Sequence, residues 1–288
     1  MNAQFERRGF SEFPALLREI PDPPEQLFIR GTYPSEDYIF LCVVGSRKYT
    51  PYGKSACQSL LSGLRGYPIA IVSGLALGID AIAHEAALTA GLPTVAVPGS
   101  GLQDSVLYPR TNFGLAQRIL KAGGALLSEF PPEHEARPEN FPQRNRIMAG
   151  LSHATLVIEA QERSGTLVTA RLTMEYNRDL LTVPGSIFSP QSAGSHYLIR
   201  NGATPITTSK DLLEALGFET TPPRTEGLEI PADCSEEERQ LLLCLDVPKE
   251  RDTLIGELEK GVAEVSALIS LLEIKGLIKE SGGMIART

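Results

Sequence analysis

The chain has 288 residues, 42% of them hydrophobic, and a formal net charge of −8 at pH 7. This length fits one large domain plus a small one, and the negative balance argues against a protein that coats nucleic acid through bulk charge. No apolar run reaches the roughly 18 residues of a membrane span, and no export signal is recognisable. The four cysteines lack metal-like spacing, so the sequence predicts a cytoplasmic protein without a metal site.

The charge is unevenly distributed along the chain. Residues 219–288 hold 8 Lys and Arg against 15 Asp and Glu, whereas residues 1–218 hold 19 against 20. Because the longer part is nearly neutral overall, it can still carry a local basic patch.

We expect residues 1–37 to form a short N-terminal lead-in. The stretch 13–20 could make one or two helical turns, and the prolines within 21–24 then stop it. This is too little for a domain.

The strongest pattern in the chain begins at Tyr38. Seven apolar or aromatic residues in a row, 38–44, predict a parallel strand that is buried on both faces. Gly45 then allows a sharp turn, and Pro51 suits the first turn of a helix. Ligands bind beyond the carboxyl ends of such strands, so Arg47 lies where a phosphate is expected, although an ordinary turn with a solvated arginine fits equally well.

The same alternation of strand and helix continues to residue 218. Further strands are predicted at 69–73, 94–97, 125–128, 155–159, 180–183 and 204–207, with helices between them. The pattern predicts an α/β fold with an extended Rossmann-like, doubly wound, mostly parallel sheet over 38–218. Right-handed crossovers then bring the loops at the strand ends to one edge.

The C-terminal part has a different pattern. Residues 219–234 are expected to form a linker, and residues 235–288 a small winged-helix-like domain. The expected elements are three helices at 235–245, 253–260 and 263–275, and a hairpin around Gly282-Gly283. The third helix has two acids and no Lys or Arg before Lys275, which favours a protein-contact or regulatory role over duplex DNA binding.

Four loops at the predicted carboxyl edge pair small residues with a helix N-terminus, where free N–H groups attract anions. One such loop is ordinary, but four with added arginines suggest a track for several phosphates, as in nucleic acid. Phe141 beside the arginines could stack a base, or it could be a core residue. The predicted DNA-binding residues are Gly45, Ser46, Arg47, Ser73, Gly74, Gly78, Phe141, Arg144, Asn145, Arg146, Ser164, Gly165 and Thr166.

Catalytic interpretations find little support in the sequence. His84 on the helix after Gly78 suits packing better than general base chemistry, and the acidic residues show no metal-ligand spacing. Neither a Gly-x-x-x-x-Gly-Lys-Ser/Thr loop nor a Gly-x-Gly-x-x-Gly turn is present. We therefore predict no catalytic residue and no cofactor.

Several runs in this order and spacing resemble the bacterial DNA-processing protein A (DprA/Smf) family. The matching runs are 44–47 with 52–53, 73–81 with 83–84, 108–109, 128–129, 141–146, 164–170, 183–185, and 198–199 with 202–203. The resemblance implies an extended Rossmann fold that binds single-stranded DNA, forms a homodimer and helps load RecA recombinase during natural transformation. It places Arg47, Phe141, Arg144 and Arg146 in the DNA pocket.

The chain departs from the family pattern in two places. The N-terminal helical domain of many members is reduced here to about 37 residues, and His196 stands where an asparagine is expected. Two other functions stay open. One is a nucleoside monophosphate phosphoribohydrolase-like enzyme, although the glutamate of its motif three residues after Thr166 is replaced by Thr169. The other is an adaptor whose tail recruits partners.

Overall fold

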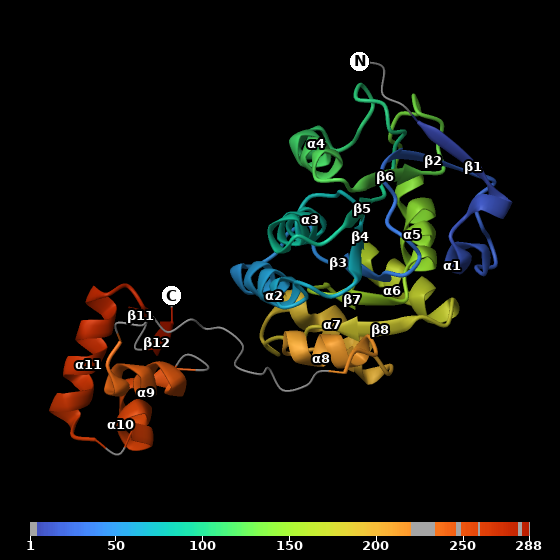
Figure 1. Ribbon diagram of the computed structural model, residues 1–288. Coiled ribbons are helices and arrows are strands. Elements are labelled where there is room, and N and C mark those ends of the chain that lie inside the picture. The colour runs from blue at the N-terminus through green and yellow to red at the C-terminus, as the bar shows by residue number, and fades with distance from the viewer. Residues whose placement is uncertain (1–4, 220–233, 246–248, 259, 282–283, 288) are drawn as a thin grey trace. The chain divides into compact units, whose positions relative to one another are not determined.

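A computed structural model (Figure 1) describes residues 5–219, 234–245, 249–258, 260–281 and 284–287. Contacts within the chain divide it into two compact units, Met1–Thr220 and Thr221–Thr288. Within the described ranges, no helix is long and apolar enough to span a lipid bilayer.

The first unit is built on a nine-stranded sheet in the order β1-β2-β6-β5-β4-β3-β7-β8-β9. The strands are β1 (Glu6–Gly9), β2 (Gln26–Gly31), β3 (Ile39–Val44), β4 (Ile69–Ser73), β5 (Thr94–Ala96), β6 (Ala125–Ser128), β7 (Ala154–Val157), β8 (Asp179–Thr182) and β9 (Thr204–Pro205). The pairs from β6 to β9 are parallel, whereas β1 and β2 are antiparallel to their neighbours. The predicted α/β, mostly parallel fold is confirmed.

Helices cover both faces of the sheet, with α2, α3 and α4 on one side and α1, α5 and α6 on the other (Figure 1). The helices are α1 (Ala15–Arg18), α2 (Pro51–Ser62), α3 (Ile79–Ala90), α4 (Phe113–Lys121), α5 (Asn140–Leu151), α6 (Gly165–Glu175), α7 (Ala193–Arg200) and α8 (Ser209–Ala215). The chain winds from β3 through β4 to β6 in one direction and resumes at β7 on the other side of β3. The sheet therefore has a topological switch point between β3 and β7.

Strand β3 lies at the centre of the fold because both of its faces are buried. Phe40, Cys42 and Val44 pack into the core cluster that includes residues of α1, α5 and α6. Leu41 and Val43 alternate with them and pack against α2, α3 and α8. This two-sided burial explains why the strand has no polar alternation.

The lead-in contains structure that the sequence analysis missed. Residues 26–31 form β2, which pairs antiparallel with β6, and β1 pairs with β2. Leu27 and Ile29 are buried whereas their neighbours are only partly covered, which is the alternation of a half-buried antiparallel strand. Residues 6–9 and 26–31 are thus part of the sheet, and the predicted helical turns at 13–20 correspond only to α1.

The second unit contains the three expected helices, α9 (Glu236–Cys244), α10 (Arg251–Leu258) and α11 (Val262–Ile274). Strands β10 (Lys249–Glu250), β11 (Ile278–Ser281) and β12 (Met284–Arg287) form an antiparallel sheet in the order β10-β12-β11. The glycines predicted at the hairpin turn and nearly all of the predicted linker lie outside the described residues. The winged-helix assignment stays a prediction.

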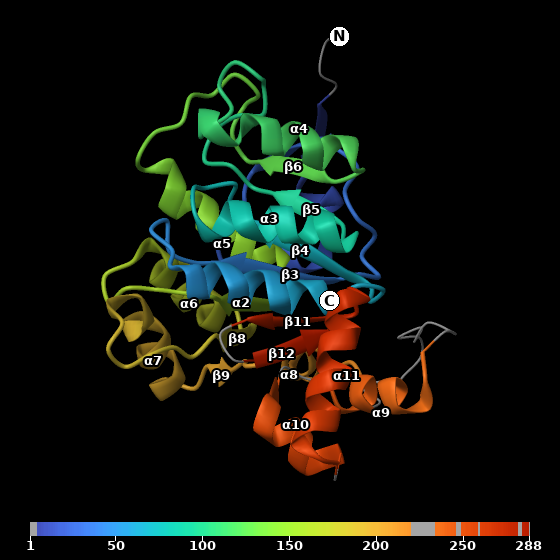
Figure 2. The ribbon, with the colours of Figure 1, turned by 90° about the vertical axis from the view of Figure 1, so that its left-hand side faces the viewer.

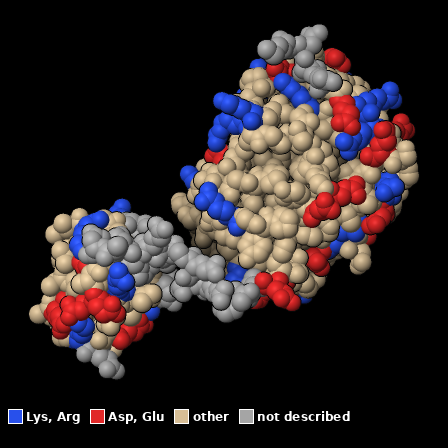
Figure 3. All heavy atoms as spheres, in the orientation of Figure 1, with Lys and Arg blue, Asp and Glu red and all other residues tan. Residues whose placement is uncertain are grey.

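Charged side chains are interspersed over the face of the larger unit that Figure 3 shows, and uncharged areas separate them. This agrees with the near-neutral balance of residues 1–218. A site for an anion must therefore depend on a local arrangement of cations.

Candidate functional site

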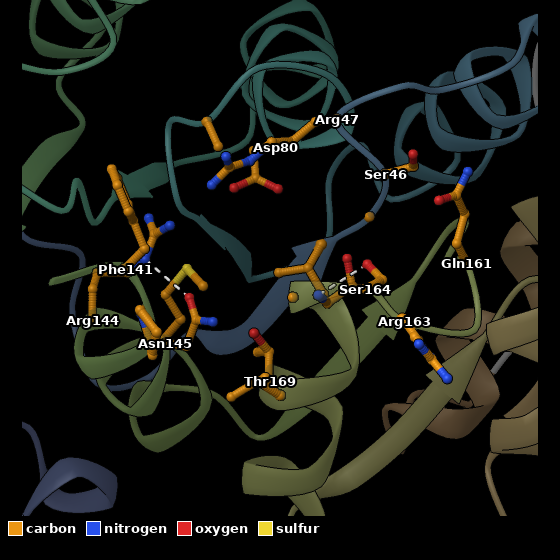
Figure 4. A pocket seen from close by; sticks show the side chains of 18 of the residues that line it. Ser46, Arg47, Asp80, Phe141, Arg144, Asn145, Gln161, Arg163, Ser164 and Thr169 are labelled. Atoms are coloured by element: carbon orange, nitrogen blue, oxygen red, sulfur yellow. Dashed lines mark hydrogen bonds between the residues drawn. The ribbon is translucent and has the colours of Figure 1, made fainter. Parts of the chain in front are cut away.

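A cavity of about 430 Å³ opens at the switch point between β3 and β7. Its wall comes from the loop after β3, the start of α3, the first turns of α5 and the loop between β7 and α6. Figure 2 shows the loop after β3 and the N-terminal ends of α2 and α5 on the left-hand side of the sheet. The labelled side chains in Figure 4 surround one hollow, so loops far apart in the sequence do share one edge.

Nine of the thirteen predicted site residues line this cavity. They are Gly45, Ser46, Arg47, Phe141, Arg144, Asn145, Ser164, Gly165 and Thr166. Ser73, Gly74, Gly78 and Arg146 do not belong to its lining. Three of these four hold neighbouring loops in position, and Arg146 points away from the cavity.

The loop after β3 is held in place from two sides. The Ser46 hydroxyl accepts a hydrogen bond from the Lys48 N–H at 3.0 Å. The buried carboxylate of Glu159, after β7, accepts from the Thr50 N–H at 2.9 Å and from the Thr50 hydroxyl at 2.6 Å. These bonds fix the backbone that carries Arg47 across the switch point.

Arg47 and Phe141 are in direct contact. The Arg47 guanidinium carbon lies 5.5 Å from the centroid of the Phe141 ring, within the range of a cation–π interaction. Gly99 lies against the same ring, since a Cβ there would come 2.6 Å from Phe141 Cδ1. Phe141 is only partly buried and lines the cavity, so it is available to a ligand and is not the core residue that the sequence left possible.

Arg144 lies in the wall of the cavity but is only 4% exposed. Its guanidinium donates to the carbonyl oxygens of Gly74, at 2.5 Å, and Val97. Its Nε donates to Asn145 Oδ1 at 3.2 Å, the bond drawn in Figure 4. Because its Nε and Nη1 donors are used within the protein, Arg144 mainly shapes the cavity.

Asp80, which is buried and also lines the cavity, balances this buried cation. Burial raises the pKa of Asp80, while Arg144 and the N–H groups of Ala76 and Gly74 oppose the rise. Burial likewise lowers the pKa of Arg144, and the Asp80 carboxylate opposes that change. The sequence analysis did not assign Asp80 to the site, because an acid in the first turn of a helix is equally common at the surface.

Three predicted residues support the site from behind. Ser73 is fully buried and donates its hydroxyl to the Val43 carbonyl at 2.6 Å. The N–H of Gly74 donates to Asp80 Oδ2 at 3.1 Å. Gly78 has a φ of +85°, and a Cβ there would lie 2.3 Å from the Ser46 carbonyl oxygen. All three therefore hold neighbouring loops in position and do not face the cavity.

Arg146 points away from the cavity. Its guanidinium donates to Glu129 Oε2 at 2.5 Å and to the Asp22 carbonyl at 2.8 Å. Positions 144 and 146 are two apart on α5, so their side chains leave the helix in different directions. The family resemblance implied that Arg144 and Arg146 share one pocket, but only Arg144 lines this cavity.

The helix α6 begins at the opposite wall of the cavity. The Ser164 hydroxyl caps it by accepting the Thr166 N–H at 3.1 Å. The preceding loop adds Gln161 and Arg163, and the first turns add Thr169. Of these last three, the sequence analysis had assigned none to the site.

His84 takes no part in the cavity. It is fully buried, and its Nδ1 lies 2.7 Å from the Thr94 hydroxyl. Burial lowers the pKa of His84 to about 3, so the ring is neutral at physiological pH. This placement agrees with the packing role predicted for it.

Three exposed cations remain at the cavity: Arg47, Lys48 and Arg163. None of them forms a salt bridge with a carboxylate of the described residues, whereas Arg146 is paired. Exposed cations, an accessible aromatic ring and the start of α6 meet here. Fold and site together define a doubly wound α/β protein with a cationic, aromatic-sided cavity at its switch point.

Comparison with known proteins agrees with this class. The family model described as DNA recombination-mediator protein A matches residues 6–217. The chain belongs to this family, the DprA/Smf family.

Two curated relatives show the extent of the similarity. Protein Smf of Escherichia coli is 43% identical over 209 residues, which are 72% of this chain and 55% of that protein. DNA processing protein DprA of Streptococcus pneumoniae is 41% identical over 206 residues, 72% of each chain. The chain thus spans only about half the length of the Escherichia coli relative that it matches.

Solved structures show the same fold. The crystal structure of DprA from Streptococcus pneumoniae superposes with a TM-score of 0.67 and 38% identity, covering 73% of this chain and 74% of that one. DNA processing protein A from Helicobacter pylori, solved for its single-stranded DNA binding mode, has a TM-score of 0.65 and 28% identity. That match covers 75% of this chain and 96% of that one.

Proposed function

We propose that this protein binds single-stranded DNA at the switch-point cavity and acts without catalysis in DNA processing for recombination or natural transformation. The observation that carries the proposal is the cavity itself, where Arg47, Lys48 and Arg163 lack carboxylate partners among the described residues and line the same cavity as Phe141. Cations hold phosphates and an aromatic ring stacks on an unpaired base.

The proposal has a direct chemical consequence. Stacking requires unpaired bases, so single strands should bind better than duplex, with little sequence preference. Phosphate contacts release counterions, so the affinity should fall as salt rises.

Arg47→Ala is the direct test. We expect the affinity for an oligo-dT to fall about tenfold and the slope of log K against log salt to shrink by about 0.7, the value for one lost phosphate contact on a single strand. Fluorescence anisotropy over a salt series measures both quantities. Arg171→Ala, which removes an exposed arginine paired with Glu175 on α6, is the matched control and should leave both unchanged. Equal binding by wild type and Arg47→Ala would remove the assignment of this cavity.

An enzyme of the phosphoribohydrolase kind is the alternative. Thr169 stands where that motif needs its glutamate, and its side chain is buried at the cavity wall. Incubation with AMP followed by chromatography separates the two functions, since release of free adenine would support the enzyme.

We also propose that the protein forms a homodimer through the region of β8, β9 and α7. This region presents Ile187, Phe188 and Tyr197, which are 79%, 91% and 51% exposed. Large exposed apolar groups, two of them adjacent in the sequence, favour an interface. We expect Phe188→Ser to shift the mass in sedimentation from dimer to monomer, whereas Phe10→Ser, also at an exposed position, should not. A wild-type monomer would refute the dimer.

The remaining part of the proposal concerns a protein partner. The family resemblance implies that the bound strand is passed to a RecA-type recombinase. Co-precipitation of purified recombinase with and without oligonucleotide tests this step. Retained recombinase binding without any DNA binding would instead favour the adaptor function.

A further inference from the structure

Tyr108 lies beside the cavity but is not part of its lining. Its side chain is 47% exposed, and its ring centroid lies 5.7 Å from that of Phe141 with an angle of 48° between the planes. The ring therefore extends the aromatic surface of Phe141 away from the cavity. Because about half of this aromatic residue is exposed directly beside Phe141, it is available to a ligand that extends out of the cavity.

The backbone that carries Tyr108 is firmly anchored. Its N–H donates to the Ser100 hydroxyl at 3.3 Å, and the Ser100 carbonyl accepts from the Ser128 hydroxyl at 2.8 Å. The preceding residue, Leu107, is fully buried in the cluster that includes residues of α4. The exposed ring is thus presented by a fixed support, which lowers the entropy cost of binding.

We propose that Tyr108 is a second stacking site, which takes an unpaired nucleobase next to the base held at Phe141. This inference rests on the proposed single-strand binding at the cavity. It assigns to that function a subsite outside the cavity wall. The ligand class is a nucleobase of any kind, because every base offers an aromatic face.

The geometry determines how the base would lie. Two rings with centroids 5.7 Å apart are in direct aromatic contact, so no base can enter between them. The base must cover the exposed side of Tyr108. Contacts then run from the Arg47 guanidinium to Phe141 and on to Tyr108, so one cation and two neighbouring rings lie in a row that could hold a phosphate and two successive bases.

A purely structural role for Tyr108 would be to brace Phe141. The two roles differ in one measurable respect. A stacking site loses affinity only through the base that it holds, whereas a brace changes the binding of the base at Phe141.

The experiment combines Tyr108→Leu in the full chain with oligo-dT probes that carry a single abasic position, moved along the strand. We expect Tyr108→Leu to weaken binding of the intact probe about tenfold and Tyr108→Phe to bind like wild type. At one position the abasic probe should cost wild type about tenfold and cost Tyr108→Leu nothing further, as in a double-mutant cycle. Phe10→Leu, at a similarly exposed aromatic residue outside the cavity lining, is the control and should bind like wild type.

Two results would overturn the inference. One is unchanged binding by Tyr108→Leu, and the other is a weakened variant that becomes insensitive to the same abasic position as Phe141→Leu, which indicates a brace and not a second stacking site. If Arg47→Ala also binds normally, the cavity assignment itself has failed. The same set of measurements therefore separates failure of the subsite from failure of the proposed function.

Discussion

Arg144→Met should lower the free energy of unfolding by about 3–5 kcal/mol, because removing one member of a buried charge pair leaves the other uncompensated. Asp80 would lose the cation that opposes its burial. The carbonyl oxygens of Gly74 and Val97 would lose their donor. Urea denaturation at pH 7 measures the change, with Arg171→Met, at an exposed arginine, as the control that should stay close to wild type.

The pH dependence of this variant provides a second check. Burial raises the pKa of Asp80 in the folded protein, so the folded state takes up its proton at higher pH than the unfolded state. Destabilisation from this carboxyl is therefore present at neutral pH and is relieved as pH falls through the folded pKa. We expect the deficit of Arg144→Met to shrink toward acid pH and in the double variant Arg144→Met/Asp80→Asn. A deficit that is constant with pH would show that lost packing and lost hydrogen bonds are responsible and that the Asp80 charge is not.

Gly78→Ala should destabilise the protein by about 2–4 kcal/mol, from backbone strain of about 1–3 kcal/mol and an added clash. The φ of Gly78 is +85°, and the new Cβ would lie 2.3 Å from the Ser46 carbonyl oxygen and 2.6 Å from Arg47 Cα. Neither contact can be relieved by a side-chain rotation, because both atoms belong to the backbone. The loop with Arg47 must move, so oligo-dT affinity should fall as well.

A matched glycine substitution elsewhere in the same unit should not lower the stability of the protein. Gly114 is exposed in α4, and a Cβ there would meet nothing within 4 Å. Gly114→Ala should leave stability unchanged or raise it by about 0.5–1 kcal/mol, since alanine loses less backbone entropy in a helix. Thermal unfolding and anisotropy measured on both variants check the pair. A stable, fully binding Gly78→Ala would show that this close approach of loops is not required.

Much of the larger unit was predictable because its strands are buried on both faces. The run 38–44 has no polar residue, and such runs stand out from their surroundings. Strand β2 was harder to recognise, since only Leu27 and Ile29 of its six residues are buried. A short alternating pattern beside prolines resembles a loop.

Only part of the site could be predicted, because the sequence shows where loops lie better than it shows where side chains point. Glycines and helix starts indicate which loops meet at the sheet edge, but they do not show which way a side chain on α5 points. Arg144 and Arg146 both look like phosphate ligands in the sequence, yet one is buried and the other is paired with Glu129. Helical periodicity could have separated them. The partner of Arg144, Asp80, is 64 positions earlier in the printed sequence, so its burial depends on tertiary packing.

The position of the cavity between β3 and β7 has a mechanical consequence. One wall belongs to the part of the sheet that winds toward β6, and the other belongs to the part that begins at β7. A bound ligand would therefore contact both parts of the sheet at once. Occupancy at a hundred times the dissociation constant would add about 2.7 kcal/mol to the resistance of the chain to unfolding. A bound nucleic-acid strand would then stabilise the folded protein reversibly, and the unbound protein would be the form that unfolds most readily.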